Sequence, residues 1–339
     1  MNGLDVKTLA DLVVARAKTD TTSPDPNNLR SGWRTDALLA DVDNLVVISF
    51  NSPAAYTEIG RQVLAQVQDL PEMSALVQLA IFRGERLLPI TPEREQMLVQ
   101  TADGLNKDVA ALLDGTRKKR CKSLLDYHVG VFVDACGRFD LAARHLRQSA
   151  KEASSFGDKA GVAIGTFSAF ACDLKQAILQ GEPWDRWFAI FTQILHEVWL
   201  ERDLGESQLY TQWAQGNYPA FMMLAYIWLG LNRPEMWDCW LAIATEPAPK
   251  LGGLFLVGLE CLNAMDLALK GSPGVDEALT KAAQLEADAQ TKATVLLALM
   301  RRALKAGDRQ LAESHVNHMP QQGAQHVVAL AKRELAQAQ

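Results

Sequence analysis

The chain lacks the short motifs that mark the commonest catalytic and nucleotide-binding sites. It has no G-x-x-x-x-G-K-[ST] phosphate loop, no G-x-G-x-x-G dinucleotide fingerprint and no G-x-S-x-G nucleophile elbow. A helix at His196-Glu197 begins like a zinc protease motif, but Leu200 stands where the second histidine is required. The motif search therefore assigns no catalytic residue, no metal site and no cofactor.

Cysteine is scarce. The 339 residues contain five cysteines, widely spaced and without a C-x-x-C pair. An odd number of scattered cysteines is typical of a reducing compartment, and the first residues lack the basic-then-apolar profile of a signal peptide. The sequence thus predicts a cytoplasmic protein.

Long apolar runs are also missing. The segment Ser207 to Asn232 has no charged residue, but its strongly apolar part, Pro219 to Leu231, is only 13 residues long. A helix that crosses a membrane needs about 20 apolar residues. We expect a core helix here and no membrane association.

Positive charge is concentrated in one place. The net charge is −6, which offers no attractive field to nucleic acid and argues against it as a partner. One basic run follows Gly115 and consists of Arg117, Lys118, Lys119, Arg120 and Lys122. It is a candidate contact for phosphate or an acidic partner. The alternative, which its composition alone favours, is a solvated linker between two domains.

A ten-residue phrase occurs twice, 170 positions apart. The copies are G-R-F-D-L-A-A-R-H-L from Gly137 and G-D-R-Q-L-A-E-S-H-V from Gly307, with Gly, Leu, Ala and His at identical offsets. A glycine that can adopt positive φ, followed by a small residue on a helix, is typical of the turn and second helix of a stacked helical hairpin.

Apolar residues recur at helical spacing along the whole chain, which predicts an all-α fold. Turns recur near Gly137, Gly181, Asn232, Gly271 and Gly307, and helix-pair repeats have a period of about 34–47 residues. We expect an α-solenoid of antiparallel helix pairs over 121–339, with a more polar capping helix at 323–338. The expected pairs are 122–136 with 139–155, 159–180 with 183–203, 218–231 with 234–245, 251–270 with 274–286, and 290–305 with 308–318.

Residues 1–120 are expected to form a separate, mostly helical region. The helices predicted there cover 4–19, 52–69, 72–88 and 92–114. Thr91-Pro92 opens the last of them with a capping side chain and a proline in the first turn. Val46 to Phe50 is the one β-branched run, and the pattern leaves a strand and a buried helix end both open.

The hairpins resemble degenerate tetratricopeptide repeats. The matching residues are Gly137 and Ala142, Gly307 and Ala312, and Ala303 in the preceding helix. No repeat carries the full signature, so HEAT-like helical repeats remain an alternative. The resemblance implies a superhelix of helix pairs whose concave face binds a peptide or a partner protein.

The aromatic residues are clustered. Seven of the eight tryptophans lie between Trp184 and Trp240. Most fit one helix face and predict core packing. The uncharged, polar stretch from Gln208 to Tyr218 favours a binding surface instead, because tyrosine and tryptophan dominate binding hot spots. The candidate partner-binding residues are Tyr210, Trp213, Tyr218 and Trp237.

The histidines suggest no firm site. His315 and His318 are three residues apart on one predicted helix with His326 beyond it, but no further ligand completes a metal site. Cys136 could meet His128 or His145 in space, although a helix C-terminus would raise the pKa of the Cys136 thiol.

The sequence therefore predicts a non-enzymatic module that binds a partner protein or peptide. A regulatory subunit of a bacterial signalling or defence complex is a more specific version that rests on fold-level analogy alone. The alternative is a small-ligand sensor or enzyme with its site between helices. The sequence does not indicate an oligomeric state.

Overall fold

The computed structural model describes residues 52–69, 71–182, 241 and 254–338. Within these ranges the protein is all-α, as predicted, with eleven helices and no strand. The contacts divide the chain into two compact units. Unit 1 is Met1–Phe132 with Arg144–Thr166, and unit 2 is Val133–Ala143 with Phe167–Gln339. The predicted helix 4–19, Val46 to Phe50 and, apart from residue 241, the predicted helices between 183 and 245 lie outside the described residues.

Unit 1 is built from helical hairpins. Helix α4 (Pro53–Leu64) packs on α5 (Pro71–Arg86), and α5 packs on α6 (Pro92–Ala111). Helices α5 and α6 agree with the predicted ranges to within three residues, whereas α4 ends at Leu64 and not at the predicted residue 69. The unit also holds most of α7 (Thr116–Ala135), the second half of α8 (Phe139–Ser154) and the start of α9 (Lys159–Gln180). Phe82 of α5 is 0% exposed and meets Phe132 of α7 edge-on, with ring centroids 6.1 Å apart.

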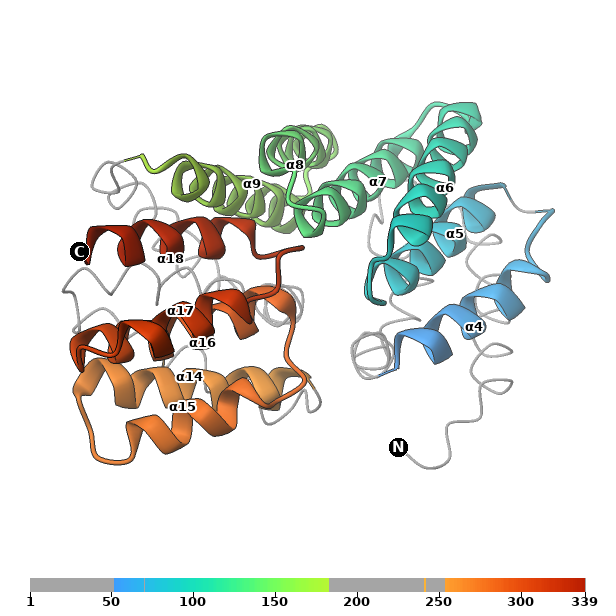
Figure 1. The fold of residues 1–339 in the computed structure, drawn as a ribbon. Helices are drawn as coiled ribbons and strands as arrows, with labels where there is room; N and C mark the ends of the chain where they lie inside the picture. The colour runs from blue at the N-terminus through green and yellow to red at the C-terminus, as the bar shows by residue number, and fades with distance from the viewer. Residues whose placement is uncertain (1–51, 70, 183–240, 242–253, 339) are drawn as a thin grey trace. The chain divides into compact units, whose positions relative to one another are not determined.

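Unit 2 contains a run of consecutive hairpins, shown in orange to red in Figure 1. Its helices are α14 (Leu254–Lys270), α15 (Val275–Ala283), α16 (Ala289–Lys305), α17 (Arg309–Asn317) and α18 (Gln325–Gln337). Sequential helices pack on one another, and α16 also contacts both α14 and α18. Thus α14, α16 and α18 lie side by side, with α15 and α17 packed against them. The core of this run includes Met265, Leu279, Val295 and Leu297, all 0% exposed.

The two copies of the repeated phrase have the same turn geometry, as predicted. Gly137 and Gly307 both have φ of 78°. In each copy the residue after the glycine donates its amide to a carbonyl five positions back, Arg138 to Val133 at 3.1 Å and Asp308 to Ala303 at 2.9 Å. This is the hydrogen-bond pattern of a helix C-terminus that is capped by a glycine in the left-handed conformation. The alanine of each phrase, five residues after its glycine, is 0% exposed.

Helix starts follow local capping chemistry. The side chain of Thr91 accepts a hydrogen bond from the Arg94 amide at 3.3 Å, which confirms the predicted cap of α6. Asp288 and Asp308 cap α16 and α17 in the same way. Ser52 occupies the cap position of α4 but makes no side-chain cap bond. No helix among the described residues is long and apolar enough to cross a membrane.

Within unit 1, α8 and α9 approach closely at Gly165. A Cβ added there would lie 2.9 Å from the carbonyl oxygen of Leu146 and 3.0 Å from Cβ of Ala150. Gly104, in contrast, is exposed in the middle of α6, and a Cβ there would meet nothing within 4 Å. The two helical glycines therefore differ only in what surrounds them.

We expect Gly165→Ala to lower the free energy of unfolding by about 1–2 kcal/mol, because the crowding outweighs the better helix propensity of alanine. Gly104→Ala should raise it by up to about 1 kcal/mol. Urea unfolding of both variants measures the two changes. Equal effects of the same sign would contradict the close α8–α9 approach.

Candidate functional site

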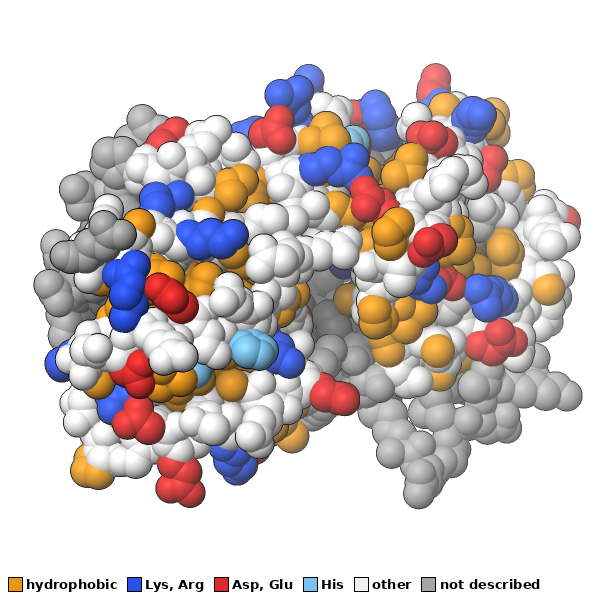
Figure 2. Space-filling model, in the orientation of Figure 1, with side chains coloured by type: hydrophobic (Ala, Val, Ile, Leu, Met, Phe, Trp, Pro, Cys, Tyr) orange, Lys and Arg blue, Asp and Glu red, His pale blue; other side chains and the backbone are white. Residues whose placement is uncertain are grey.

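The basic run occupies the first turns of helix α7. The linker predicted for it is wrong, because α7 begins at Thr116 and includes all five basic residues. Three of them are ion-paired within unit 1: Arg117 to Glu72 at 2.5 Å, Lys118 to Asp114 at 3.0 Å and Lys122 to Glu152 at 2.9 Å. Lys119 is exposed, and Arg120 is half-buried. On the face drawn in Figure 2, basic and acidic side chains are interspersed.

A cluster of side chains that includes a buried lysine lies inside unit 2, and the sequence did not predict it. We call it the lysine cluster, and it consists of Asp134, Phe139, Cys172, Lys175 and His326. The Lys175 side chain is 6% exposed, and its Nζ donates to the carboxylate of Asp134 at 2.6 Å and 2.9 Å. The Cys172 thiol donates to the same carboxylate at 3.4 Å, and Lys175 Nζ lies 5.7 Å from the centre of the Phe139 ring.

The electrostatics of the lysine cluster hold its groups in unreactive forms. Burial alone would lower the pKa of Lys175, but the neighbouring Asp134, Cys172 and Asp288 outweigh it and raise that pKa above its ordinary value. Burial, with a further contribution from Asp134, raises the pKa of the Cys172 thiol well above its usual range. Lys175 therefore stays an ammonium ion and Cys172 stays a thiol, so neither is an activated nucleophile or base.

His326 is a fully enclosed member of the lysine cluster. It is 0% exposed, and neither ring nitrogen has a hydrogen-bond partner. Its ring meets Phe139 edge-on, with centroids 5.2 Å apart. Burial, and then the charge of Lys175, hold the pKa of His326 well below its usual range. The imidazole is therefore neutral near pH 7 and packs as an aromatic side chain.

The lysine cluster lies where α18 joins α7 and α9. Arg333 of α18 donates to the last carbonyl oxygens of α9, those of Ile178 and, at 3.2 Å, Leu179. Gln325 donates to the Cys136 carbonyl beside the Gly137 turn at 3.5 Å. A bidentate pair from Arg301 to Glu334, at 2.8 Å and 2.6 Å, ties α16 to α18. These contacts hold together helices that are distant in the sequence, and the cluster they surround is closed rather than an open site.

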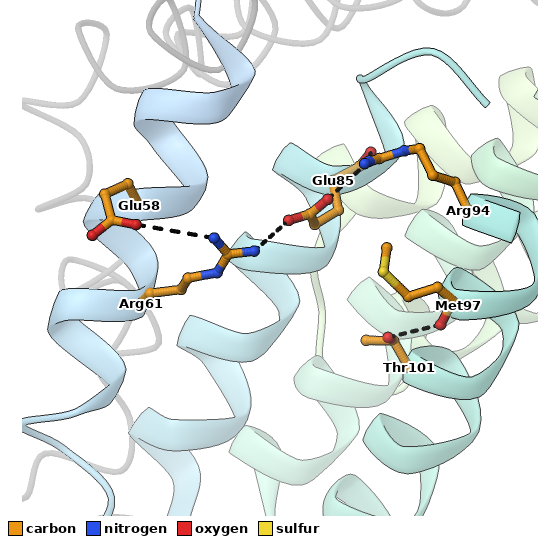
Figure 3. A network of polar contacts seen from close by, with 6 residues as sticks. All are labelled: Glu58, Arg61, Glu85, Arg94, Met97 and Thr101. Carbon is orange, nitrogen blue, oxygen red and sulfur yellow. Dashed lines mark hydrogen bonds and ion pairs between the residues drawn. The ribbon is translucent and has the colours of Figure 1, made fainter. Parts of the chain in front are cut away.

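A chain of ion pairs joins helices α4, α5 and α6 of unit 1 (Figure 3). Glu85 of α5 is at its centre, with a side chain that is 13% exposed. It accepts from Arg61 of α4 and from Arg94 of α6, each at 2.8 Å. Arg94 also donates to the Glu85 carbonyl oxygen at 2.7 Å, and Glu58 lies 4.0 Å from Arg61. Both oxygens of Glu85 are thus used to hold α4 and α6 against α5.

Three of the other histidines considered from sequence have polar neighbours of their own. His145 Nδ1 lies 3.0 Å from the carboxylate of Asp126, and His128 lies against Arg86. His318 Nδ1 lies 2.7 Å from the Ser314 carbonyl oxygen. No group of three potential metal ligands occurs within the described ranges.

The four aromatic residues predicted to bind a partner all lie outside the described residues: Tyr210, Trp213, Tyr218 and Trp237. They stay predictions.

The sequence carries only a weak signal for Lys175, which with Asp173 is one of two charged residues in the mostly apolar stretch from Phe167 to Leu179. Such a lysine needs a buried counterion. The spacing does not identify Asp134, which is 41 residues away and on another helix.

Comparison of the chain with models of protein families, with curated proteins and with solved structures finds no match.

Proposed function

We propose that this chain is a non-enzymatic interaction module, an α-solenoid of tetratricopeptide-like or HEAT-like hairpins that holds a segment of a partner protein. The observation that carries the proposal is the packing order in unit 2, where α14, α16 and α18 lie side by side and α15 and α17 pack against them. Repeat proteins stack helix pairs in this order, and the extended surface of such a stack is what a partner occupies.

The turn geometry supports the same reading of the chain as a set of repeats. Gly181 and Gly271 also have positive φ, and the residue that follows each of them bonds back five positions, as at Gly137 and Gly307. Gly157 has the same geometry, so one type of turn ends five of the described helices. Repetition of a turn at fixed offsets is what a solenoid requires of its sequence.

The chemistry of the lysine cluster favours a binding module over an enzyme. Its lysine is protonated, its thiol has a raised pKa and its histidine has no hydrogen-bond partner. The lysine cluster therefore offers no nucleophile–base pair. The alternative function, a small-ligand sensor or enzyme, would need a site elsewhere. A cytoplasmic location and a regulatory role are further proposals that rest on the sequence alone.

The test is affinity capture of the full chain from native lysate, followed by mass spectrometry. The wild type is compared with a Tyr210→Ala/Trp213→Ala/Tyr218→Ala variant and with a Lys118→Ala/Lys119→Ala variant. We expect a stoichiometric protein partner that the aromatic variant loses and the lysine variant keeps, because large aromatic side chains dominate binding energy. Circular dichroism of both variants checks that they fold. Capture of no stoichiometric protein by the wild type would contradict the module.

A further inference from the structure

Arg86, in the last turn of α5, lies against His128 of α7. Its Nη2 atom is 3.4 Å from Nδ1 of His128, which is 7% exposed. A guanidinium group can only donate, so this nitrogen of His128 must accept and the imidazole is neutral. Burial, followed by the charges of Arg86 and Arg83, holds the pKa of His128 well below its usual range. The histidine therefore brings no charge to the pair.

The charge of Arg86 has no acidic partner among the residues that the structure describes. The adjacent Glu85 is occupied by Arg61 and Arg94 (Figure 3). Burial and the like charge of Arg83 lower the pKa of Arg86 to about 10, although Tyr127 and Tyr56 act in the opposite direction. A buried cation without a counterion is costly, so its presence needs a cause.

Two buried polar atoms of α5 and α4 also lack hydrogen-bond partners. Nε of Arg86 and Oγ1 of Thr57 are both buried and make no hydrogen bond. Thr57 belongs to α4, and its Oγ1 faces Gly84 of the same α5 turn that carries Arg86. Arg86 is half-buried, so part of it reaches the surface. Arg86 thus carries a charge without a described acidic partner and a donor without an acceptor, in a side chain that is not fully closed to solvent.

We propose that Arg86 binds an oxyanion, a carboxylate or a phosphate group. A guanidinium presents its Nε and Nη donors as a planar fork that matches two oxygens of one anion. The negative end of the α5 dipole is a weaker explanation, because it stabilises a terminal cation by at most about 1 kcal/mol at a surface position. This inference does not depend on the helical-repeat proposal.

The experiment is thermal unfolding of the full chain with sodium phosphate, with sodium acetate, and with sodium chloride at matched ionic strength. We expect phosphate, acetate or both to raise the unfolding midpoint above that in chloride, by about 2 °C or more. The variant Arg86→Met should lose the shift. In chloride it should be at least as stable as the wild type, because it removes an uncompensated charge.

Two further variants make the result specific. Arg302→Met removes an arginine that pairs with Asp276 on the surface of unit 2, and it should keep the full shift. Arg86→Lys keeps the charge but not the planar fork, so it should keep only part of the shift in unfolding midpoint. This variant tests the proposal even if Arg86→Met does not fold. A shift with phosphate alone identifies a phosphate site, and one with acetate alone a carboxylate site. The proposal is overturned if neither anion exceeds chloride, or if Arg86→Met shifts as the wild type does.

Discussion

Replacing Asp134 by leucine is expected to lower the free energy of unfolding by about 3 kcal/mol near neutral pH, because it leaves the Lys175 ammonium ion buried without a counterion. Lys175 is 6% exposed at its side chain and has no other carboxylate within ion-pair distance among the described residues. Urea unfolding at neutral pH measures the loss. The surface variant Glu313→Leu, which breaks an exposed pair with Arg309, should cost less than about 1 kcal/mol.

The double variant Asp134→Leu/Lys175→Met separates the pair from the packing around it. Replacing both partners by apolar side chains removes the uncompensated charge, so most of the stability should return. An Asp134→Leu variant no less stable than Glu313→Leu would contradict a buried pair. A double variant as unstable as the single one would locate the loss in packing instead.

The stability of the single variant Asp134→Leu should also depend on pH in a characteristic way. In the wild type the pKa of Lys175 is raised, so its contribution to stability is present below the unfolded value and is lost as pH rises through the folded value. Without Asp134, burial instead lowers the pKa of Lys175, and the fold gains stability as the lysine loses its proton. The difference between wild type and Asp134→Leu should therefore narrow at alkaline pH.

The second large effect is a loss of stability in mild acid to which His326 contributes, together with His128. The folded pKa of His326 is held well below the usual value by burial, so below about pH 6.5 the unfolded chain binds a proton that the folded chain does not. Each pH unit between the unfolded and folded pKa values is worth about 1.4 kcal/mol. Stability should therefore fall as pH falls from about 6.5 towards the folded pKa.

The variant His326→Leu tests this. It removes two buried nitrogens that have no hydrogen bond, and it loses the edge-on contact with Phe139, so we expect a net gain of about 1 kcal/mol at neutral pH. Its stability should also decline less steeply in acid. His318→Leu, on the exposed surface, controls for the loss of a histidine. Urea unfolding at several pH values gives both quantities, and parallel acid curves for wild type and His326→Leu would contradict the assignment.

Local patterns predicted most of the described helices. The helix expected at 159–180 is α9 itself, and the hairpins after Gly137, Gly271 and Gly307 begin and end close to their predicted positions. This worked because a glycine with positive φ and an apolar period of 3.6 are properties of adjacent residues. The start of α7 was missed because the run from Arg117 to Lys122 has no apolar face of its own to signal a helix.

The polar clusters could not be predicted in the same way. Asp134 meets Lys175, and Phe139 meets His326, only after four helices, α7, α8, α9 and α18, have packed together. Helical spacing assigns each residue to one face of its own helix, but it does not say which other helix packs against that face. His326 was considered only for its distance from His315 and His318. Arg86 carried no signal, because an arginine at a helix C-terminus is ordinary.

The central claim is that the hairpins form a surface for a partner protein. The most direct measurement is amide hydrogen exchange of the chain alone and in the complex captured from lysate. The account predicts slower exchange, on partner binding, in a continuous stretch that includes Tyr210 to Trp237, with exchange in α4 and α5 unchanged. A complex that protects no stretch of the hairpin region, or protection confined to α4 and α5, would contradict it.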